Sequence, residues 1–214
     1  MQTFPSKIMP PKIHVIAVAF KRFDLLKVFV QSWINQTKDN WILTVIHDGL
    51  DDEFISIMKD YKQLCTDRIE YICTDRRFND YGHSLRDIGL SNVKGDYVLL
   101  TNADNYFIPK ALEFINEVFV NNSPNIVIFD MVHSHENPGE RELPAYSFFE
   151  TSFEYRSIDI SAAIVQSNLA SKVGFKDKTH DGDQSYFEDI RRLKSASAEE
   201  LTIVKIHRVL LVHN

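Results

Sequence analysis

Residues 96–107 of the chain read DYVLLTNADNYF, a buried-strand pattern that runs directly into a polar cluster. The segment 97–101 is apolar, whereas 102–105 carries one carboxylate and two carboxamides. Because alternate residues of an extended segment point the same way, Asn102 and Asp104 can face one ligand together. Oxygen ligands of this kind suit a hard cation such as Mg²⁺ or Mn²⁺ that also binds phosphate. The alternative is that Asp104 or Asn105 only caps the helix expected near Pro109, or shapes a turn.

Strand-like and helical segments alternate on both sides of this stretch. Apolar runs rich in β-branched residues predict strands at 12–20, 41–49, 69–75, 96–104 and 125–132. Helical spacing predicts helices at 24–36, 52–64, 83–93 and 109–122, with Asp24 as an N-cap and Pro109 at the first helical position. This alternation is typical of βαβ units, so we expect an α/β fold with a mostly parallel central sheet flanked by helices.

The second half of the chain is less regular. Residues 134–157 show no clean period and predict a long irregular loop. A strand followed by a short helix is expected in 159–175, a helix in 186–197, and one or two strands in 201–214. Because the chain stops directly after a strand-like segment, we expect it to be a single domain, 1–214, cut from a longer protein.

Polar residues follow several of the expected strands. In open parallel sheets, ligands bind outside the carboxyl ends of the strands. We therefore expect four loops to converge on one edge, formed by residues 20–22, 47–49, 74–77 and 102–104. Asp48 can accept hydrogen bonds from a base or a ribose there, although an Asx turn with Gly49 would explain it equally well.

Asp181 and Asp183 precede the expected helix at 186–197. A general base that deprotonates a hydroxyl must be a carboxylate or a histidine facing the donor, which makes both aspartates candidates. The competing interpretation of Asp183 is a helix N-cap.

Eight histidines are spread along the chain. His133 and His135 share a strand face but have no third partner at a recognisable spacing, so we do not expect a zinc site. His213 follows the apolar run VLLV and could reach the cation from the last strand.

Composition narrows the class of protein. The 214 residues are 44% hydrophobic and carry a formal net charge of −6, with no run of Lys and Arg longer than two. This balance argues against a nucleic-acid groove or an anionic membrane surface as the main partner. The apolar runs are far shorter than the roughly 20 residues that span a bilayer, and the N-terminus lacks a signal peptide's apolar region. With only Cys65 and Cys73, we expect reduced thiols and a cytoplasmic location.

The order of these motifs resembles the large inverting GT-A glycosyltransferase family, which uses nucleotide-diphospho-sugars. HDGL at 47–50 is similar to the family's Asp-Asp-Gly-Ser, with Asp48 at its second Asp. NDYGHSLRDIGL at 79–90 is similar to the segment that precedes the family's Asp-x-Asp, and LLTNADN stands at the Asp-x-Asp position. There are three departures from the family pattern: Asn102 replaces the first Asp, His47 replaces an Asp, and DGD at 181–183 replaces a Glu-Asp pair.

The resemblance implies a metal-dependent transfer of a sugar, most readily from a UDP-sugar, to a hydroxyl of an oligosaccharide or glycoprotein acceptor. It implies a donor-binding part at about 12–105 and an acceptor-binding part at about 106–214. Asp183, with Asp181 in reserve, would be the base, and Asp104 with His213 would bind Mn²⁺ or Mg²⁺. The expected donor contacts are Ala19, Phe20, Arg22, Asp48, Asp75, Arg76, Arg86, Asn102 and Ala103.

Two other functions stay open. A sugar nucleotidyltransferase would need a glycine-rich phosphate loop after the first strand, but AFKRFD contains no glycine. A catalytically inactive nucleotide- or glycan-binding module is compatible with Asn102. The compact size and the C-terminal cut also resemble the first domain of a chlorovirus protein that synthesises capsid glycans, which would place the chain in host-cell cytoplasm. Separately, we expect a monomer or weak dimer.

Overall fold

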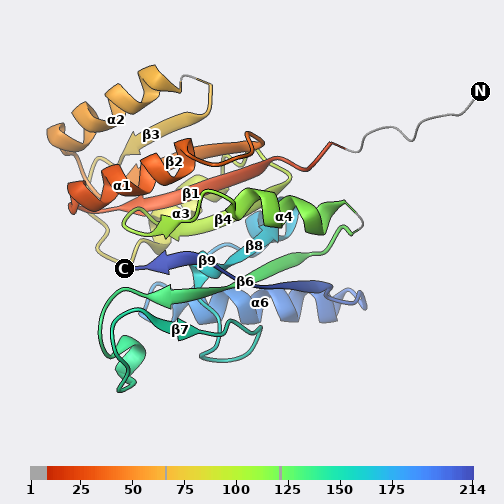
Figure 1. Ribbon diagram of the computed structural model, residues 1–214. Coiled ribbons are helices and arrows are strands. Elements are labelled where there is room, and N and C mark those ends of the chain that lie inside the picture. Colours follow the sequence, from red (N-terminus) through yellow and green to blue (C-terminus); the bar gives the residue numbers. More distant parts are fainter. Residues whose placement is uncertain (1–8, 66, 121) are drawn as a thin grey trace, which may run out of the picture.

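A computed structural model describes residues 9–65, 67–120 and 122–214 of the chain (Figure 1). The N-terminal half alternates strands and helices as predicted. Its elements are β1 (Ile13–Ala19), α1 (Phe23–Ile34), β2 (Trp41–His47), α2 (Asp52–Leu64), β3 (Ile69–Cys73), α3 (His83–Leu90), β4 (Tyr97–Asn102), β5 (Tyr106–Phe107) and α4 (Ala111–Phe119).

The second half is more ordered than its sequence suggests. It contains β6 (Ile126–His133), η1 (Pro138–Glu140), β7 (Ser147–Phe149), η2 (Ile160–Ala162), β8 (Ala163–Gln166), α5 (Ser167–Val173), α6 (Gly182–Ala196) and β9 (Ile203–His213). The prediction of an irregular loop over 134–157 was therefore wrong in part, because β7 pairs with β6 inside it. Residues 203–213 form one strand rather than two.

The strands form one mixed sheet with the order β3-β2-β1-β4-β8-β6-β9-β5, and β7 pairs with β6 off this path. The pairs β3–β2, β2–β1, β1–β4 and β6–β9 are parallel. Because β8 is antiparallel to both β4 and β6, strands β4 and β6 run in the same direction. The carboxyl ends of β1, β2, β4, β6 and β9 therefore lie along one edge, near the C-terminus (Figure 1).

Helices cover both faces of the sheet. All seven residues of β1 are buried, as a strand covered on both sides requires. Odd-numbered β1 residues pack with apolar residues of α1, α2 and α4, and Ile16 and Val18 pack with α3, α5 and α6. No described helix is long and apolar enough to cross a membrane.

Two predicted helix starts were wrong. The N-cap of α1 is Arg22, in the left-handed region and without a side-chain cap, so Asp24 lies in the first turn. The N-cap of α4 is Lys110, which leaves Pro109 outside the helix. Neither Asp104 nor Asn105 caps α4, so the capping interpretation of the 102–105 cluster was also wrong.

Candidate active site

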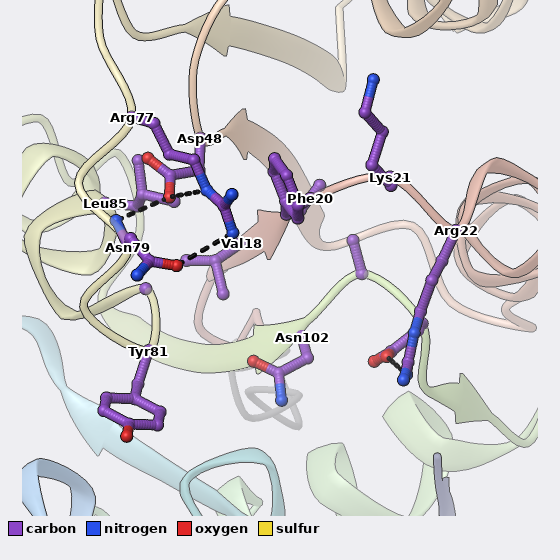
Figure 2. Close-up of a pocket in the computed structure, with 14 residues that line it drawn as sticks. Val18, Phe20, Lys21, Arg22, Asp48, Arg77, Asn79, Tyr81, Leu85 and Asn102 are labelled. Carbon is purple, nitrogen blue, oxygen red and sulfur yellow. Dashed lines mark hydrogen bonds and ion pairs between the residues drawn. The ribbon is translucent and has the colours of Figure 1, made fainter. Parts of the chain in front are cut away.

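A cavity of about 440 Å³ opens at the carboxyl edge of β1, β2 and β4, a size typical of small-molecule sites. The predicted convergence of four loops at this edge is confirmed, since each supplies at least one lining residue (Figure 2). The described lining residues are Val18, Ala19, Phe20, Lys21, Arg22, Asp48, Arg77, Asn79, Tyr81, Gly82, Leu85, Asn102, Ala103 and Asp104.

The loop after β1 brings two cations to the cavity. Lys21 and Arg22 both have left-handed backbones, with φ of 55° and 50°, which turn the chain sharply away from the strand. The buried ring of His47 stabilises this turn, since its Nε2 accepts from the Lys21 amide at 3.3 Å while its Nδ1 donates to the Gly49 carbonyl at 2.8 Å. His47 is therefore a structural residue next to the cavity and is not among the described lining residues.

Asp48 organises the opposite wall of the cavity. Its Oδ1 accepts from the Phe78 amide at 2.7 Å and its Oδ2 accepts from the Asn79 amide at 2.9 Å. The Arg77 guanidinium lies 3.8 Å from the same Oδ2, and Figure 2 shows Arg77, Asp48 and Asn79 gathered on one side. The Asx-turn interpretation with Gly49 was wrong, because Asp48 orders a turn about 30 residues away in the chain.

The turn after β3 presents a different arginine from the one predicted. Asp75 and Arg76 are not among the described lining residues, and the Arg76 guanidinium lies 5.0 Å from the ring centre of Phe78 instead. Arg77 faces the cavity, with its guanidinium 3.7 Å from the ring centre of Phe20. Of the three residues 75–77, each of which could have faced a diphosphate, Arg77 is the one that lines the cavity.

Asn79, Tyr81, Gly82 and Leu85 also line the cavity and were not predicted. Asn79 and Tyr81 have left-handed backbones. Gly82 has a φ of 82°, and a Cβ there would lie 2.7 Å from Val18 Cγ2, so only glycine lets α3 begin against β1. The Asn-Asp-Tyr-Gly sequence before α3 was the available signal, because such residues favour tight turns.

Each polar side chain of the cluster at the end of β4 contacts a different partner. Asn102 Oδ1 accepts from Arg86 Nη2 at 2.8 Å. Asp104 faces the cavity, and its Oδ2 accepts from Arg22 Nη1 at 2.7 Å. Asn105 is fully buried, donates to Thr101 and Ser161, and accepts the backbone N–H of Asn214 at 3.1 Å. The polar residues at the end of β4 thus contact cationic side chains at the cavity and, through Asn105, the residue that follows β9.

Asp104 suits a divalent cation. Its Oδ1 is buried and has no hydrogen-bond partner among the described residues, although its side chain is 16% exposed toward the cavity. A carboxylate oxygen left without a donor is costly unless a cation or water reaches it. Asp104 supplies the single carboxylate with which Mg²⁺ and Mn²⁺ are often held alongside phosphate, whereas the carboxamide oxygen of Asn102 is already bonded to Arg86.

Arg86, expected to contact the donor, is not among the described lining residues and instead links Asn102 to Asp183. Arg86 is only 1% exposed, although charged groups are rarely buried without a partner. Its Nη1 donates to the Tyr81 carbonyl at 2.9 Å and lies 3.8 Å from Asp183 Oδ1. Because Asn102 is neutral, Asp183 is the carboxylate that balances this buried charge.

Asp183 is partly buried beside His83. Its Oδ1 lies 3.6 Å from His83 Nδ1 and has no hydrogen-bond partner among the described residues, while 35% of the side chain is exposed. Burial raises the pKa of Asp183, and the nearby charge of Arg86 opposes this rise. Burial lowers the pKa of His83. A carboxylate with a raised pKa and an open face is suited to accept a proton.

The DGD sequence places Asp183 in this environment. Gly182 is buried, and a Cβ on it would lie 2.5 Å from His83 Nε2 and 2.6 Å from the Asp177 carbonyl oxygen. Asp181 is the N-cap of α6 and its side chain is 80% exposed. The interpretation of Asp183 as the N-cap was therefore wrong. Of the two predicted bases, Asp183 is the one next to Arg86.

His213 has different neighbours from those expected. It is not among the described residues that line the cavity, and its Nε2 lies 3.5 Å from Asp159 Oδ2. Its ring centre lies 5.1 Å from that of His133 and 6.3 Å from that of His135. No third histidine stands at a recognisable spacing in the sequence, but the pairing of β6 with β9 brings His213 close to His133 and His135.

Comparisons with known proteins identify the family. A sequence profile described as "Glycosyl transferase family 2" matches residues 14–171. The glycosyltransferase GlyA of Streptococcus pneumoniae is 26% identical over 132 residues, which cover 62% of this chain and 18% of GlyA.

Two solved structures share the fold. S. aureus TarS 1–349 in complex with UDP-GlcNAc has a TM-score of 0.73 at 15% identity, over 94% of this chain and 58% of that one. The mannosyltransferase PcManGT of Pyrobaculum calidifontis, in complex with GDP-Man and Mn²⁺, has a TM-score of 0.67 at 14% identity, over 96% of this chain and 57% of that one. The chain thus spans less than two thirds of each of these proteins and has their GT-A-like α/β architecture. With a profile match over most of its length, the chain belongs to glycosyl transferase family 2.

Proposed function

We propose that the chain is a metal-dependent inverting glycosyltransferase that moves a sugar from a nucleotide-diphospho-sugar to a hydroxyl of a glycan acceptor. The observation that carries this proposal is Asp104 Oδ1, which has no hydrogen-bond partner in the described part of the chain and belongs to a residue that lines a cavity formed by four strand-end loops. Family membership supports the reaction class.

The charge distribution of the cavity suits a nucleoside diphosphate. Lys21, Arg22 and Arg77 supply cations, and Phe20 offers an aromatic face that is 41% exposed. Arginine guanidinium groups match phosphate oxygens in geometry. The described lining residues all fall within 18–104, which supports a donor-binding part at about 12–105. We favour UDP because the TarS structure contains UDP-GlcNAc, while the GDP-Man complex of PcManGT keeps GDP as an alternative.

Asp104 would hold the cation. When bound there, Mn²⁺ or Mg²⁺ supplies positive charge against the donor's diphosphate. PcManGT, which shares the fold, was solved with Mn²⁺. From the sequence we also assigned His213 to this ion. In the structure the ring of His213 lies beside that of His133, with the ring centres 5.1 Å apart.

Asp183 would act as the general base. Its carboxylate takes the proton of the acceptor hydroxyl as that oxygen forms a bond to the anomeric carbon. The bond from that carbon to the diphosphate oxygen breaks on the opposite face, and the diphosphate leaves with the electron pair. One displacement inverts the configuration. Arg86 and His83 keep the carboxylate oriented.

Asn102 favours a second candidate, an inactive nucleotide- or glycan-binding module. In the structure, however, Asn102 accepts a hydrogen bond from Arg86, and Asp104 Oδ1 has no hydrogen-bond partner among the described residues. The proposed cation ligand is therefore Asp104, and Asn102 does not weigh against activity. A nucleotidyltransferase has less support, because the loop after β1 is stabilised by His47 and contains no glycine.

The proposal extends to features that the cavity does not determine. We propose an oligosaccharide or glycoprotein acceptor bound by residues 106–214, a cytoplasmic location, and a monomer or weak dimer. A source in a chlorovirus rests on the sequence resemblance alone.

Calorimetry with UDP and GDP, each with and without Mn²⁺, tests the proposal. The proposed enzyme should bind one nucleotide at least tenfold more tightly with Mn²⁺, and Asp104→Asn should remove that gain. Donor hydrolysis, screened across UDP-, GDP- and dTDP-sugars, needs no known acceptor. Equal nucleotide affinity with and without the metal, together with no hydrolysis, would show an inactive module instead.

A further inference from the structure

A second, shallow pocket of about 90 Å³ lies between helix α6 and the segment that precedes η2. Residues 153–155 and Ile158 form one wall. The other wall is one face of α6, which presents Gln184, Glu188 and Arg191 at helical spacing. The pocket has an apolar floor, because Phe153 and Phe187 are buried with their ring centres 5.7 Å apart.

This pocket adjoins the proposed base at two points of the chain. Gln184 directly follows Asp183 at the start of α6. Ile158 directly precedes Asp159, whose Oδ2 lies 3.5 Å from His213 Nε2 at the end of β9. Successive helical residues are separated by about 100° around the helix axis and 1.5 Å along it, so the pocket begins around the helix from Asp183. An acceptor with one hydroxyl at Asp183 therefore has its neighbouring sugar close to this pocket.

The side chains around the pocket suit a sugar ring. Tyr155 is 60% exposed, and the guanidinium of Arg156 lies 5.4 Å from its ring centre. An aromatic face is electron-rich and packs well against the C–H groups on one face of a pyranose. The rim of a pyranose carries hydroxyls, which need both donors and acceptors. Gln184 and Glu188 supply these groups.

The hydrogen bonds of Gln184 are long enough to be exchanged for bonds to a ligand. Its Nε2 lies 3.5 Å from Glu188 Oε1, and its Oε1 accepts the Arg156 amide at 3.3 Å. Hydrogen bonds at such lengths are at the weak end of the range. Sugar hydroxyls can replace them without leaving a buried polar group unpaired.

The charges of the pocket favour a neutral ligand over an anion. Of its described lining residues, Arg191 is the only cation, whereas Glu154 and Glu188 are both acidic. Arg191 Nη2 donates to the Phe153 carbonyl and lies 3.5 Å from Glu154 Oε1, so its charge is already balanced within the protein. A phosphate or a carboxylate would meet two acidic side chains here.

We propose that this pocket binds a neutral sugar ring of the acceptor glycan, with Tyr155 against its apolar face and Gln184 and Glu188 bonded to its hydroxyls. The inference rests on the proposed function and deepens it, since it names an acceptor subsite next to the base. Selection of the acceptor would then depend on residues 153–158, a segment without a recognisable period in the sequence.

Saturation-transfer NMR with the methyl glycosides of glucose, galactose, mannose and N-acetylglucosamine tests the subsite. At least one glycoside should receive saturation on its ring protons. Tyr155→Ala should weaken its binding by about threefold to tenfold, and Tyr155→Phe, which keeps the aromatic face, should restore it. Phe148→Ala is the matched control, because Phe148 is 58% exposed and is not among the described lining residues. Saturation of none of the four sugars, or wild-type binding in Tyr155→Ala, would overturn the subsite.

Donor hydrolysis distinguishes failure of this inference from failure of the proposed function. The glycoside that binds should accelerate nucleotide release from the donor, and Tyr155→Ala should raise its half-maximal concentration by the same factor as in the binding experiment. Wild-type protein that hydrolyses the donor but responds to none of the sugars would keep the enzyme and overturn the subsite. Wild-type protein that binds a glycoside through Tyr155 but hydrolyses no donor would keep the sugar pocket and overturn the enzyme.

Discussion

Arg22 Nη1 lies 2.7 Å from Asp104 Oδ2, so a flexible cation contacts the carboxylate proposed to bind the metal. The arginine side chain is 62% exposed, whereas that of Asp104 is 16% exposed. Ion pairs with one partner this exposed contribute no more than about 1 kcal/mol, so a divalent ion can displace the guanidinium. Arg22 is therefore placed to leave Asp104 when metal arrives and to turn toward a phosphate group.

Arg22→Ala should strengthen Mn²⁺ binding in the absence of nucleotide. Removing the competing cation should tighten binding by a factor of about two to five, corresponding to less than about 1 kcal/mol. Titration of free Mn²⁺ by electron paramagnetic resonance measures this directly. Lys27→Ala, which removes an exposed cation from α1, should leave the affinity unchanged. Unchanged or weaker Mn²⁺ binding in Arg22→Ala would show that the arginine does not compete for Asp104.

Asp183→Asn should stop donor hydrolysis and sugar transfer while leaving nucleotide affinity intact. A positioned general base contributes about 10²–10⁴-fold to rate, so the loss should fall in that range. Asp181→Asn, at the exposed N-cap of the same helix, is the matched control and should keep most of the activity. Normal turnover in Asp183→Asn would show that another group accepts the proton.

The alternation of strands and helices and the donor edge could be predicted because they depend on local patterns, whereas the strand order could not. A buried parallel strand is apolar along its whole length, and the residue after it is polar wherever a ligand binds. The positions of Asp48 and Asp104 at the cavity follow from this rule alone.

Other features depend on geometry that no local pattern encodes. The choice of Arg77 over Arg76 is made by a turn that Asp48 holds through two backbone amides. The approach of His213 to His133 requires the register of two strands about 80 residues apart in the chain. Strands β5 and β7 have two and three residues, too few for a period to be recognised.

Gly182→Ala should impair catalysis more than binding. The added methyl group would overlap His83 Nε2 and the Asp177 carbonyl, so the first turn of α6 must move and carry Asp183 with it. Overpacking of this kind costs about 1–3 kcal/mol of stability, and a shift of about 1 Å in a catalytic group can cost about 10²-fold in rate.

Donor hydrolysis and urea unfolding of Gly182→Ala separate these two effects. The expected result is at least tenfold slower hydrolysis with unchanged nucleotide affinity at temperatures where the variant is folded. Gly139→Ala is a control for backbone strain away from the base: its φ of 59° strains the new side chain, although the methyl group would come no closer than 3.6 Å to the nearest atoms, so it should lower stability without slowing hydrolysis by the folded protein. Wild-type hydrolysis in Gly182→Ala would mean that the start of α6 does not position the base.

His14 should make the stability of the domain fall in mild acid. Its ring is 1% exposed between β1 and β2, where Nε2 lies 2.9 Å from Thr44 Oγ1, and burial, aided by Lys94, lowers its pKa from 6.5 to about 4. Between these two values the unfolded chain binds a proton that the folded chain does not, so the free energy of unfolding rises with pH up to about 6.5 and is then independent of His14. Relative to its value above pH 6.5, the free energy of unfolding should be about 2–3 kcal/mol lower at pH 4.5 because of this one group. Urea unfolding from pH 4.5 to 7.5 should show a shallower pH dependence in His14→Gln than in the wild type, and parallel curves for the two proteins would contradict the assignment.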